Sequence, residues 1–211
     1  MKMTYKSNST IEKMISDTCF SYEQPWFYNN PFAFRCELGM GVTKRAYLKN
    51  AKARAYKIFD ILFQNKPDVV FFDCYIEDYV PLVEFYGKKA LKPFRKDAKF
   101  LAQHIKKYDY SVINNVRLSE DEKENYIQKN RVICYADKKY PYKKRITDTF
   151  LREEKHVHFV SFENECILSV YDDRGCDVVF ATEEKMREFY IKLEPYFLEF
   201  DVEEMKKRAD K

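Results

Sequence analysis

Three carboxylates and one arginine, residue types that can bind a metal or take part in acid–base chemistry, gather in one short segment near the end of the chain. They are Asp172, Asp173, Arg174 and Asp177. Carboxylates can hold a divalent cation, and an arginine can bind an anionic group. Apolar runs at residues 166–171 and 176–181 flank the segment and predict a β-hairpin that turns between them.

The turn itself explains part of this segment. Asp172, at the first position of a type I turn, can accept a hydrogen bond from the backbone two residues on. Gly175 would supply the left-handed backbone conformation of a three-residue loop with a bulge. A turn does not require Asp173 or Arg174, and Asp177 has no evident role in it. The segment is therefore either a solvated polar turn or the tip of a binding or catalytic site, and the sequence leaves both open.

Two histidines form a second candidate constellation. His156 and His158 lie two residues apart on a presumed strand, so both side chains point to the same face. A metal site needs at least one more ligand, and Glu163 and Cys166 are the nearest residues of a suitable type. Two histidines alone are a weak signal, and no metal site is predicted from them.

A basic helix is the third candidate. Residues 44–64 have helical hydrophobic spacing, and the polar face carries Lys and Arg with no acidic residue before Asp60. Further basic clusters occur at residues 88–89, 95–96 and 143–145. Such a face can track phosphates, but no nucleic-acid-binding motif accompanies it, so a solvated surface is the preferred explanation and nucleic-acid binding is not favoured.

Signatures of known catalytic machinery are missing from the chain. There is no phosphate-binding loop, no dinucleotide fingerprint and no glycine-flanked nucleophile. With three histidines in all, His-dependent acid–base catalysis has few candidates. No catalytic residue and no cofactor are predicted, and the balance favours a protein that is not an enzyme.

The strands and helices predicted around these residues indicate an α+β fold. Strands at 69–76, 110–117, 131–135 and 157–160 mix with the hairpin and with a half-buried strand at 32–38, without a regular βαβ rhythm. Helices are predicted at 11–18, 44–64, within 93–107, at 142–154 and from Thr182 to Pro195, with Thr43 and Thr182 as caps. We expect one domain over residues 1–211, a mixed, mostly antiparallel sheet packed with three to five helices. Its core would run roughly from 25 to 200, and the tail from 206 would fray.

The charge distribution and the cysteines indicate the cellular compartment in which the protein functions. Residues 1–145 carry 28 Lys/Arg against 17 Asp/Glu, whereas residues 146–211 carry 10 against 17. The chain therefore has a basic front, residues 1–145, and an acidic rear, residues 146–211. The six cysteines show no CxxC pair, and the polar start of the chain predicts no secretory segment. No apolar run approaches the length of a membrane span. These features predict reduced thiols and a cytoplasmic location.

Two motifs resemble one protein family. Val170 to Val179, with the Tyr-Asp-Asp-Arg-Gly turn, is similar to the C-terminal half of the bacterial family of unknown function DUF3885, whose following hydrophobic segment ends near an aspartate, here Asp201. The N-terminal motif of the same family is similar to Arg35-Cys36-Glu37-Leu38-Gly39 of this chain, which is followed by a helix with Arg54 and Phe59. The family usually has Phe at the position of Cys36. The resemblance spans about residues 25–200 and implies a fold relative without an established activity.

If these motifs are shared, the resemblance implies a candidate binding set. Its members are Arg35, Glu37, Asp172, Asp173 and Arg174, to which the hairpin adds Asp177. Arginines and carboxylates alternating on strands could equally form an ion-pair lattice that fixes strand register without chemistry. Both interpretations stay open.

The sequence as a whole favours a cytosolic bacterial binding protein, most concretely an immunity protein that neutralises a toxin by direct binding. The acidic rear would suit a toxin with a basic cleft. One alternative is a metal-dependent enzyme using Asp172 and Asp173 with Glu37. The other is a nucleic-acid-binding protein that uses the basic helix 44–57. A protein partner is expected, a membrane is not, and the sequence leaves the oligomeric state open.

Overall fold

Seven strands pair edge to edge into the sheet around which the described chain is organised. The computed structural model describes residues 26–64, 66–77, 110–113, 126–135, 140–152 and 157–210. The strands are β1 (Ala33–Glu37), β2 (Val69–Glu77), β3 (Tyr110–Ile113), β4 (Tyr126–Tyr135), β5 (Val157–Ser161), β6 (Cys166–Val170) and β7 (Gly175–Phe180). They lie in the order β1-β7-β6-β5-β2-β4-β3, and every pairing between them is antiparallel.

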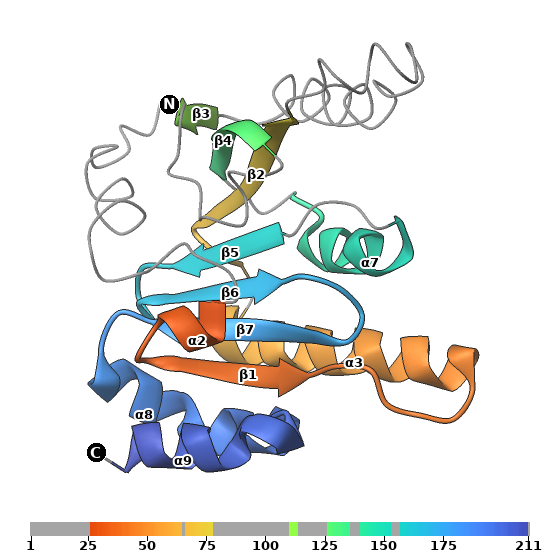
Figure 1. Cartoon of the computed structure of the whole chain (residues 1–211), viewed down its shortest axis with the longest axis vertical. Coiled ribbons are helices and arrows are strands. Elements are labelled where there is room, and N and C mark those ends of the chain that lie inside the picture. Colours follow the sequence, from red (N-terminus) through yellow and green to blue (C-terminus); the bar gives the residue numbers. More distant parts are fainter. Residues whose placement is uncertain are drawn as a thin grey trace.

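Helices cover both faces of the β1–β7–β6 end of the sheet. The α-helices of the described residues are α2 (Trp26–Asn29), α3 (Lys44–Phe63), α7 (Tyr142–Arg152), α8 (Glu183–Leu193) and α9 (Val202–Ala209), with 3-10 turns η2 (Glu194–Tyr196) and η3 (Glu199–Asp201) between the last two. Figure 1 shows α2 in front of β1 and β7, α3 behind them, and α8 and α9 beyond the β1 edge. The α+β class and the mostly antiparallel sheet predicted from the sequence are confirmed.

One face of the sheet is apolar because alternate strand residues are. Phe34, Val178, Leu168 and Phe159 lie side by side across four strands, and all are buried. Phe59 of α3 packs edge-on against Phe159 with 5.2 Å between ring centroids. On the α8 side, Phe189 stacks on Phe180 and Tyr190 packs edge-on against Phe34. This face is the hydrophobic core, and it is built largely from rings.

The caps predicted for two helices are present. The hydroxyl of Thr43 accepts a hydrogen bond from the N–H of Ala46, and the hydroxyl of Thr182 accepts one from the N–H of Lys185. Each thus satisfies one of the N–H groups that a helix start leaves without an intrahelical partner. The last turn of α3 ends at Gln64, which takes a positive φ of 54°.

Several boundaries differ from the prediction. The short helix α2, which is not among the predicted helices, buries Trp26 and Phe27. β4 begins at Tyr126 rather than at residue 131. The predicted frayed tail is wrong up to Ala209, because α9 buries Met205 completely and is therefore held by packing. The helices predicted at 11–18 and within 93–107 fall outside the described residues.

None of the helices that the structure describes offers an apolar stretch of the length that crossing a bilayer would need.

The cap at Thr182 gives a direct test of what holds α8. Thr182→Ala removes the hydroxyl acceptor, and we expect the free energy of unfolding to fall by about 1 kcal/mol in urea titrations. Thr182→Ser keeps the acceptor and should stay within a few tenths of a kcal/mol of the parent. Equal losses in the two variants would show that the methyl group, not the cap, matters.

Candidate functional site

Polar side chains form a row across the face of the sheet opposite to the apolar core. The strand register places Arg35 of β1 beside Asp177 of β7, Asp177 beside Ser169 of β6, and Ser169 beside His158 of β5. Asp177, Ser169 and His158 are buried, and the side chain of Arg35 is 13% exposed. These four residues lie on the second face of the sheet, which in an antiparallel sheet is often exposed to solvent.

Strand geometry brings Arg35 and Asp177 together. Backbone hydrogen bonds join Leu38 to Arg174 and Phe180 to Phe32, each at 2.8 Å, and mark the hydrogen-bonded positions of the β1–β7 pair. Hydrogen-bonded and non-hydrogen-bonded pairs alternate along an antiparallel ladder. Arg35 and Asp177 lie three residues from each of these hydrogen-bonded positions, so they form a non-hydrogen-bonded pair. The Cα atoms of such a pair are only about 4.5 Å apart, which places the side chains close together.

Arg35 is held by four groups. Its Nε donates to Oδ1 of Asp177 at 2.9 Å and its Nη2 donates to Oδ2 at 3.3 Å. Its Nη1 lies 3.9 Å from Oδ2 of Asp201, whose Oδ1 accepts the hydroxyl of Tyr28 at 3.0 Å. The guanidinium also lies over the rings of Tyr28 and Phe27, 4.6 Å and 5.3 Å from their centroids. Cation–π contacts of this kind gain strength as water is excluded.

Burial dominates the protonation of Asp177. It raises the pKa of this carboxyl above its usual value, and the hydrogen bonds and charge of Arg35 and the N–H of Phe27 lower it only in part. The N–H of Phe27 donates to Oδ2 of Asp177 at 3.1 Å. For Arg35, burial opposes the charged form, but the hydrogen bond and charge of Asp177 outweigh it and the pKa of the guanidinium is raised. Arg35 therefore stays a cation.

His158 packs against two aromatic rings, which also stack on each other. Its ring stacks on Trp26 of α2 with a centroid distance of 4.9 Å and on Phe71 of β2 with 4.4 Å. Cys166, one of the two extra ligands considered for a metal, is on a strand position that faces the apolar side, because it is three residues from Ser169. His156 lies outside the described residues, and within the described ranges no three His, Cys, Asp or Glu side chains are grouped as metal ligands would be.

The hairpin tip is tied by its own residues. Oδ1 of Asp172 accepts the backbone N–H of Arg174 at 2.8 Å, which confirms the turn predicted for Asp172. Oδ2 accepts Nε of the Arg174 side chain at 2.7 Å, so Arg174 does have a local partner. The Arg174 side chain is nonetheless 77% exposed, and its charge remains accessible to solvent.

The reason given for Gly175 from the sequence is wrong. Among the described glycines only Gly41 has a positive φ, so Gly175 is not in the left-handed conformation. Instead, a Cβ at Gly175 would lie 2.2 Å from the hydroxyl of Tyr171 and 2.9 Å from the carbonyl oxygen of Cys36. Glycine is needed here because Tyr171 lies directly across the hairpin and leaves no space for a side chain.

These residues surround one open hollow of about 780 Å³ at the strand ends, called the strand-end hollow below. Its lining combines rings, charges and small residues from β1, the hairpin, α2 and α3. The lining residues are Trp26, Arg35, Cys36, Glu37, Gly39, Tyr47, Ser169, Tyr171, Asp172, Arg174, Asp177 and Leu198. The structure thus brings together Arg35, Glu37, Asp172, Arg174 and Asp177 of the candidate set.

Asp173 is the candidate that does not line the hollow. It is half-buried at the hairpin tip, on the side of Tyr47. Burial raises the pKa of Tyr47, and the charges of Asp173 and Asp172 raise it further. Glu37 is also half-buried, and its backbone carbonyl accepts Nε of Arg54 at 2.7 Å, which attaches α3 to β1.

Sequence reasoning missed the aromatic part of the lining. Trp26, Tyr47 and Tyr171 come from three separate elements, and no local pattern links them. Asp201, which the resemblance places only near the end of the hydrophobic segment, is 5% exposed and lies at the Arg35 guanidinium. A conspicuous Tyr beside the turn and a Trp between two prolines were the available signals.

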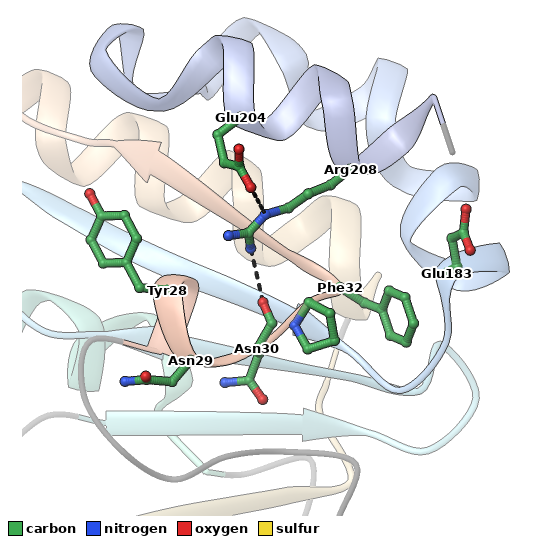
Figure 2. Close-up of a pocket in the computed structure, with 8 residues that line it drawn as sticks. Tyr28, Asn29, Asn30, Phe32, Glu183, Glu204 and Arg208 are labelled. Atoms are coloured by element: carbon green, nitrogen blue, oxygen red, sulfur yellow. Dashed lines mark hydrogen bonds and ion pairs between the residues drawn. The ribbon is translucent and has the colours of Figure 1, made fainter.

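A second, smaller pocket of about 470 Å³ lies between α2 and α9. Figure 2 shows Arg208 reaching from α9 toward the turn after α2, with Glu204 beside it. Nη1 of Arg208 donates to the carbonyl oxygens of Phe27 and Asn30, each at 2.9 Å, and Nε donates to Glu204 at 3.0 Å. The guanidinium also lies 4.2 Å from the centroid of the Phe27 ring. Arg208 therefore fastens α9 onto α2, which is a structural role.

An antiparallel sheet with a buried arginine–aspartate pair and an aromatic hollow defines the class of fold but not an activity. The chain belongs to the family described as a domain of unknown function, DUF3885, whose model matches residues 11–201. No curated protein and no solved structure is significantly similar to it.

The packing of Gly175 can be tested with a double-mutant cycle. Gly175→Ala forces a Cβ against Tyr171 and Cys36, and we expect a loss of about 1–3 kcal/mol in the free energy of unfolding, as for other overpacked sites. Combining it with Tyr171→Phe removes the nearest atom, so the double variant should lose less than the sum of the two single losses. Additive losses in urea unfolding would contradict the proposed contact.

The Arg35–Asp177 pair predicts a pH-dependent defect. Burial already raises the pKa of Asp177, and removing Arg35 raises it further. A carboxyl whose folded pKa exceeds its unfolded value of about 4 destabilises the folded state increasingly as the pH rises above 4. Arg35→Met should therefore lower the free energy of unfolding by about 3–5 kcal/mol at a pH near 8, and by less at a pH near 4.5.

The control for this defect is the Asp177→Asn background, in which the pH dependence of the Arg35→Met loss should shrink. Urea unfolding at several pH values measures both series. A loss that stays constant, or that grows toward acid, would show that Arg35 does not act through the Asp177 carboxylate.

Proposed function

We propose that the chain binds a protein partner through the strand-end hollow and the loop beside it. The observation that carries this proposal is the gathering of five of the six candidate residues around one open hollow together with Trp26, Tyr47 and Tyr171. Trp, Tyr and Arg are the residue types that dominate binding energy at protein interfaces. They offer large contact areas with few rotatable bonds.

The charges of the hollow support a preformed binding surface. Arg35 is engaged by Asp177, and Asp172 by Arg174, before any partner arrives. A partner that covers the hollow would not have to bury an unpaired charge at those positions, which would be costly. The rim adds apolar surface, because the loop after Gly39 exposes Met40 and leaves Val42 fully exposed.

The narrower proposal is a cytoplasmic bacterial immunity protein that neutralises a toxin by occlusion. Mixed charges and rings suit a protein surface better than a small metabolite of one charge sign. The acidic rear of the chain would add attraction toward a toxin with a basic cleft. The thiols of Cys36 and Cys176 lie on paired positions of β1 and β7 and are free, which supports a reducing compartment.

The metal-dependent alternative has less support. It requires the Asp172 and Asp173 carboxylates, with Glu37, to share a cation, but Asp172 already accepts two hydrogen bonds from Arg174. Asp173 does not line the hollow with Glu37. The carboxylates that this reaction would need are therefore engaged or separated.

The binding proposal is tested with the product of a neighbouring gene. We expect that product to co-purify with this chain and to lose toxicity in a growth assay when the chain is co-expressed. Val42→Asp combined with Arg174→Glu should reduce affinity at least tenfold, because both side chains are exposed at the rim.

The matched control is Ile191→Asp combined with Lys192→Glu, which makes the same chemical changes on α8, where Ile191 is 79% exposed. This control should bind like the parent. A product that is equally lethal with and without the chain would refute the immunity function. Equal loss of binding in the two variants would refute the hollow as the site.

A further inference from the structure

The exposed side of α3 carries a row of cations. Arg45, Lys49 and Lys52 are spaced four and three residues apart, which places them on one stripe of the helix. All three are exposed, and none has a carboxylate within ion-pair distance in the part of the chain that the structure describes. These three residues are called the basic stripe below.

Tyr56 continues the stripe and attaches it to α7. The Tyr56 hydroxyl donates to the carbonyl oxygen of Lys143 at 2.9 Å and lies 2.7 Å from the hydroxyl of Thr147. The ammonium groups of Lys52 and Lys143 lie 5.4 Å and 5.5 Å from the centroid of the Tyr56 ring. Lys144, the next residue of α7, is exposed as well. Two helices distant in sequence therefore contribute cations to one surface.

Little negative charge offsets this surface. Asp60 is the single acidic residue of α3, and it pairs with Lys143 at 2.7 Å. The first turn of α3 holds Lys44 and Arg45 and no acidic residue. Cations there oppose the helix dipole, whose positive end is at the N-terminus. This placement costs stability. It also adds the positive potential of the α3 N-terminus to that of the Lys44 and Arg45 side chains.

We infer that the basic stripe, with the adjoining α7 lysines, binds the phosphodiester backbone of a double-stranded nucleic acid without reading its sequence. This surface is separate from the strand-end hollow. Tyr47, which lines the hollow, lies two residues from Arg45 and so on the opposite side of α3. The inference does not depend on the proposed partner binding.

The spacing of the cations fits a phosphate backbone. Seven residues separate Arg45 from Lys52, which is roughly 10 Å of helix axis. A duplex carries one phosphate charge per about 1.7 Å of its axis when both strands are counted, so each of the three cations can reach a phosphate. A single small anion would need convergent donors, whereas these side chains project in a line.

Base reading is not expected from this surface. The hydroxyl of Tyr56 is already bonded to α7, and its ring is flanked by two lysines, so it is not free to stack on an unpaired base. Phosphate contacts position a protein on a duplex but carry no sequence information. Binding should therefore depend strongly on salt and weakly on sequence.

The experiment measures the binding of the full chain to fluorescent DNA and RNA duplexes of about 20 base pairs and mixed sequence. Fluorescence anisotropy at salt concentrations from about 50 to 200 mM should give a slope of log K against log salt of about −3 to −4, as expected for three or four phosphate contacts. Replacing all three residues of the basic stripe with Gln should weaken binding at least tenfold and reduce the slope by about 3.

The matched control replaces Lys185, Lys192 and Lys207 with Gln, which removes the same charge from two other helices, α8 and α9. Its affinity and slope should stay close to the parent, and thermal unfolding should show all three proteins folded. Binding of either duplex through the stripe supports the inference. It is overturned if neither duplex binds at about 50 mM salt, if the control loses as much affinity as the stripe variant, or if only anionic lipid vesicles are bound.

Discussion

A buried cation on an edge strand is the constraint on which the described structure depends. Arg35 cannot lose its charge, so each neighbour must stabilise a guanidinium with little access to water. Asp177 from β7 does so by hydrogen bonds, Asp201 before α9 by charge, and the α2 rings by cation–π contact. One side chain thus connects the start, the hairpin and the end of the described chain. The ion-pair lattice considered from the sequence is present at Arg35 and Asp177, and it also forms one wall of the strand-end hollow.

The two glycines of the motifs, Gly39 and Gly175, also connect separate parts of the structure. A Cβ at Gly175 would collide with Tyr171, and one at Gly39 would lie 1.9 Å from the ring of Tyr47. Both tyrosines line the strand-end hollow. The glycines therefore serve the placement of aromatic rings rather than the bending of the backbone. Rings that pack closely on the backbone have few alternative rotamers, so less side-chain entropy would be lost when a partner binds.

The two surfaces of interest are supported from opposite sides of one helix. The inner side of α3 packs Phe59 on the sheet and presents Tyr47 to the hollow, and Arg54 links it to β1. Its outer side carries the basic stripe and meets α7 through Tyr56. Asp60, the single acidic residue of α3, pairs with Lys143 of α7. The strand-end hollow and the basic stripe share no residue.

The sequence by itself determined most of the local elements and most of the charged residues of the site. Alternation on β1, the apolar runs of the hairpin, helical spacing over 44–64, and the caps Thr43 and Thr182 are properties of neighbouring residues, so pattern and propensity predicted them. The partner of Arg35, the stacking of His158 on Trp26 and Phe71, and the reason for Gly175 depend on residues up to 142 positions apart. Only the tertiary structure decided them, because strand order and register choose which side chains become neighbours, and neither is encoded in any single segment.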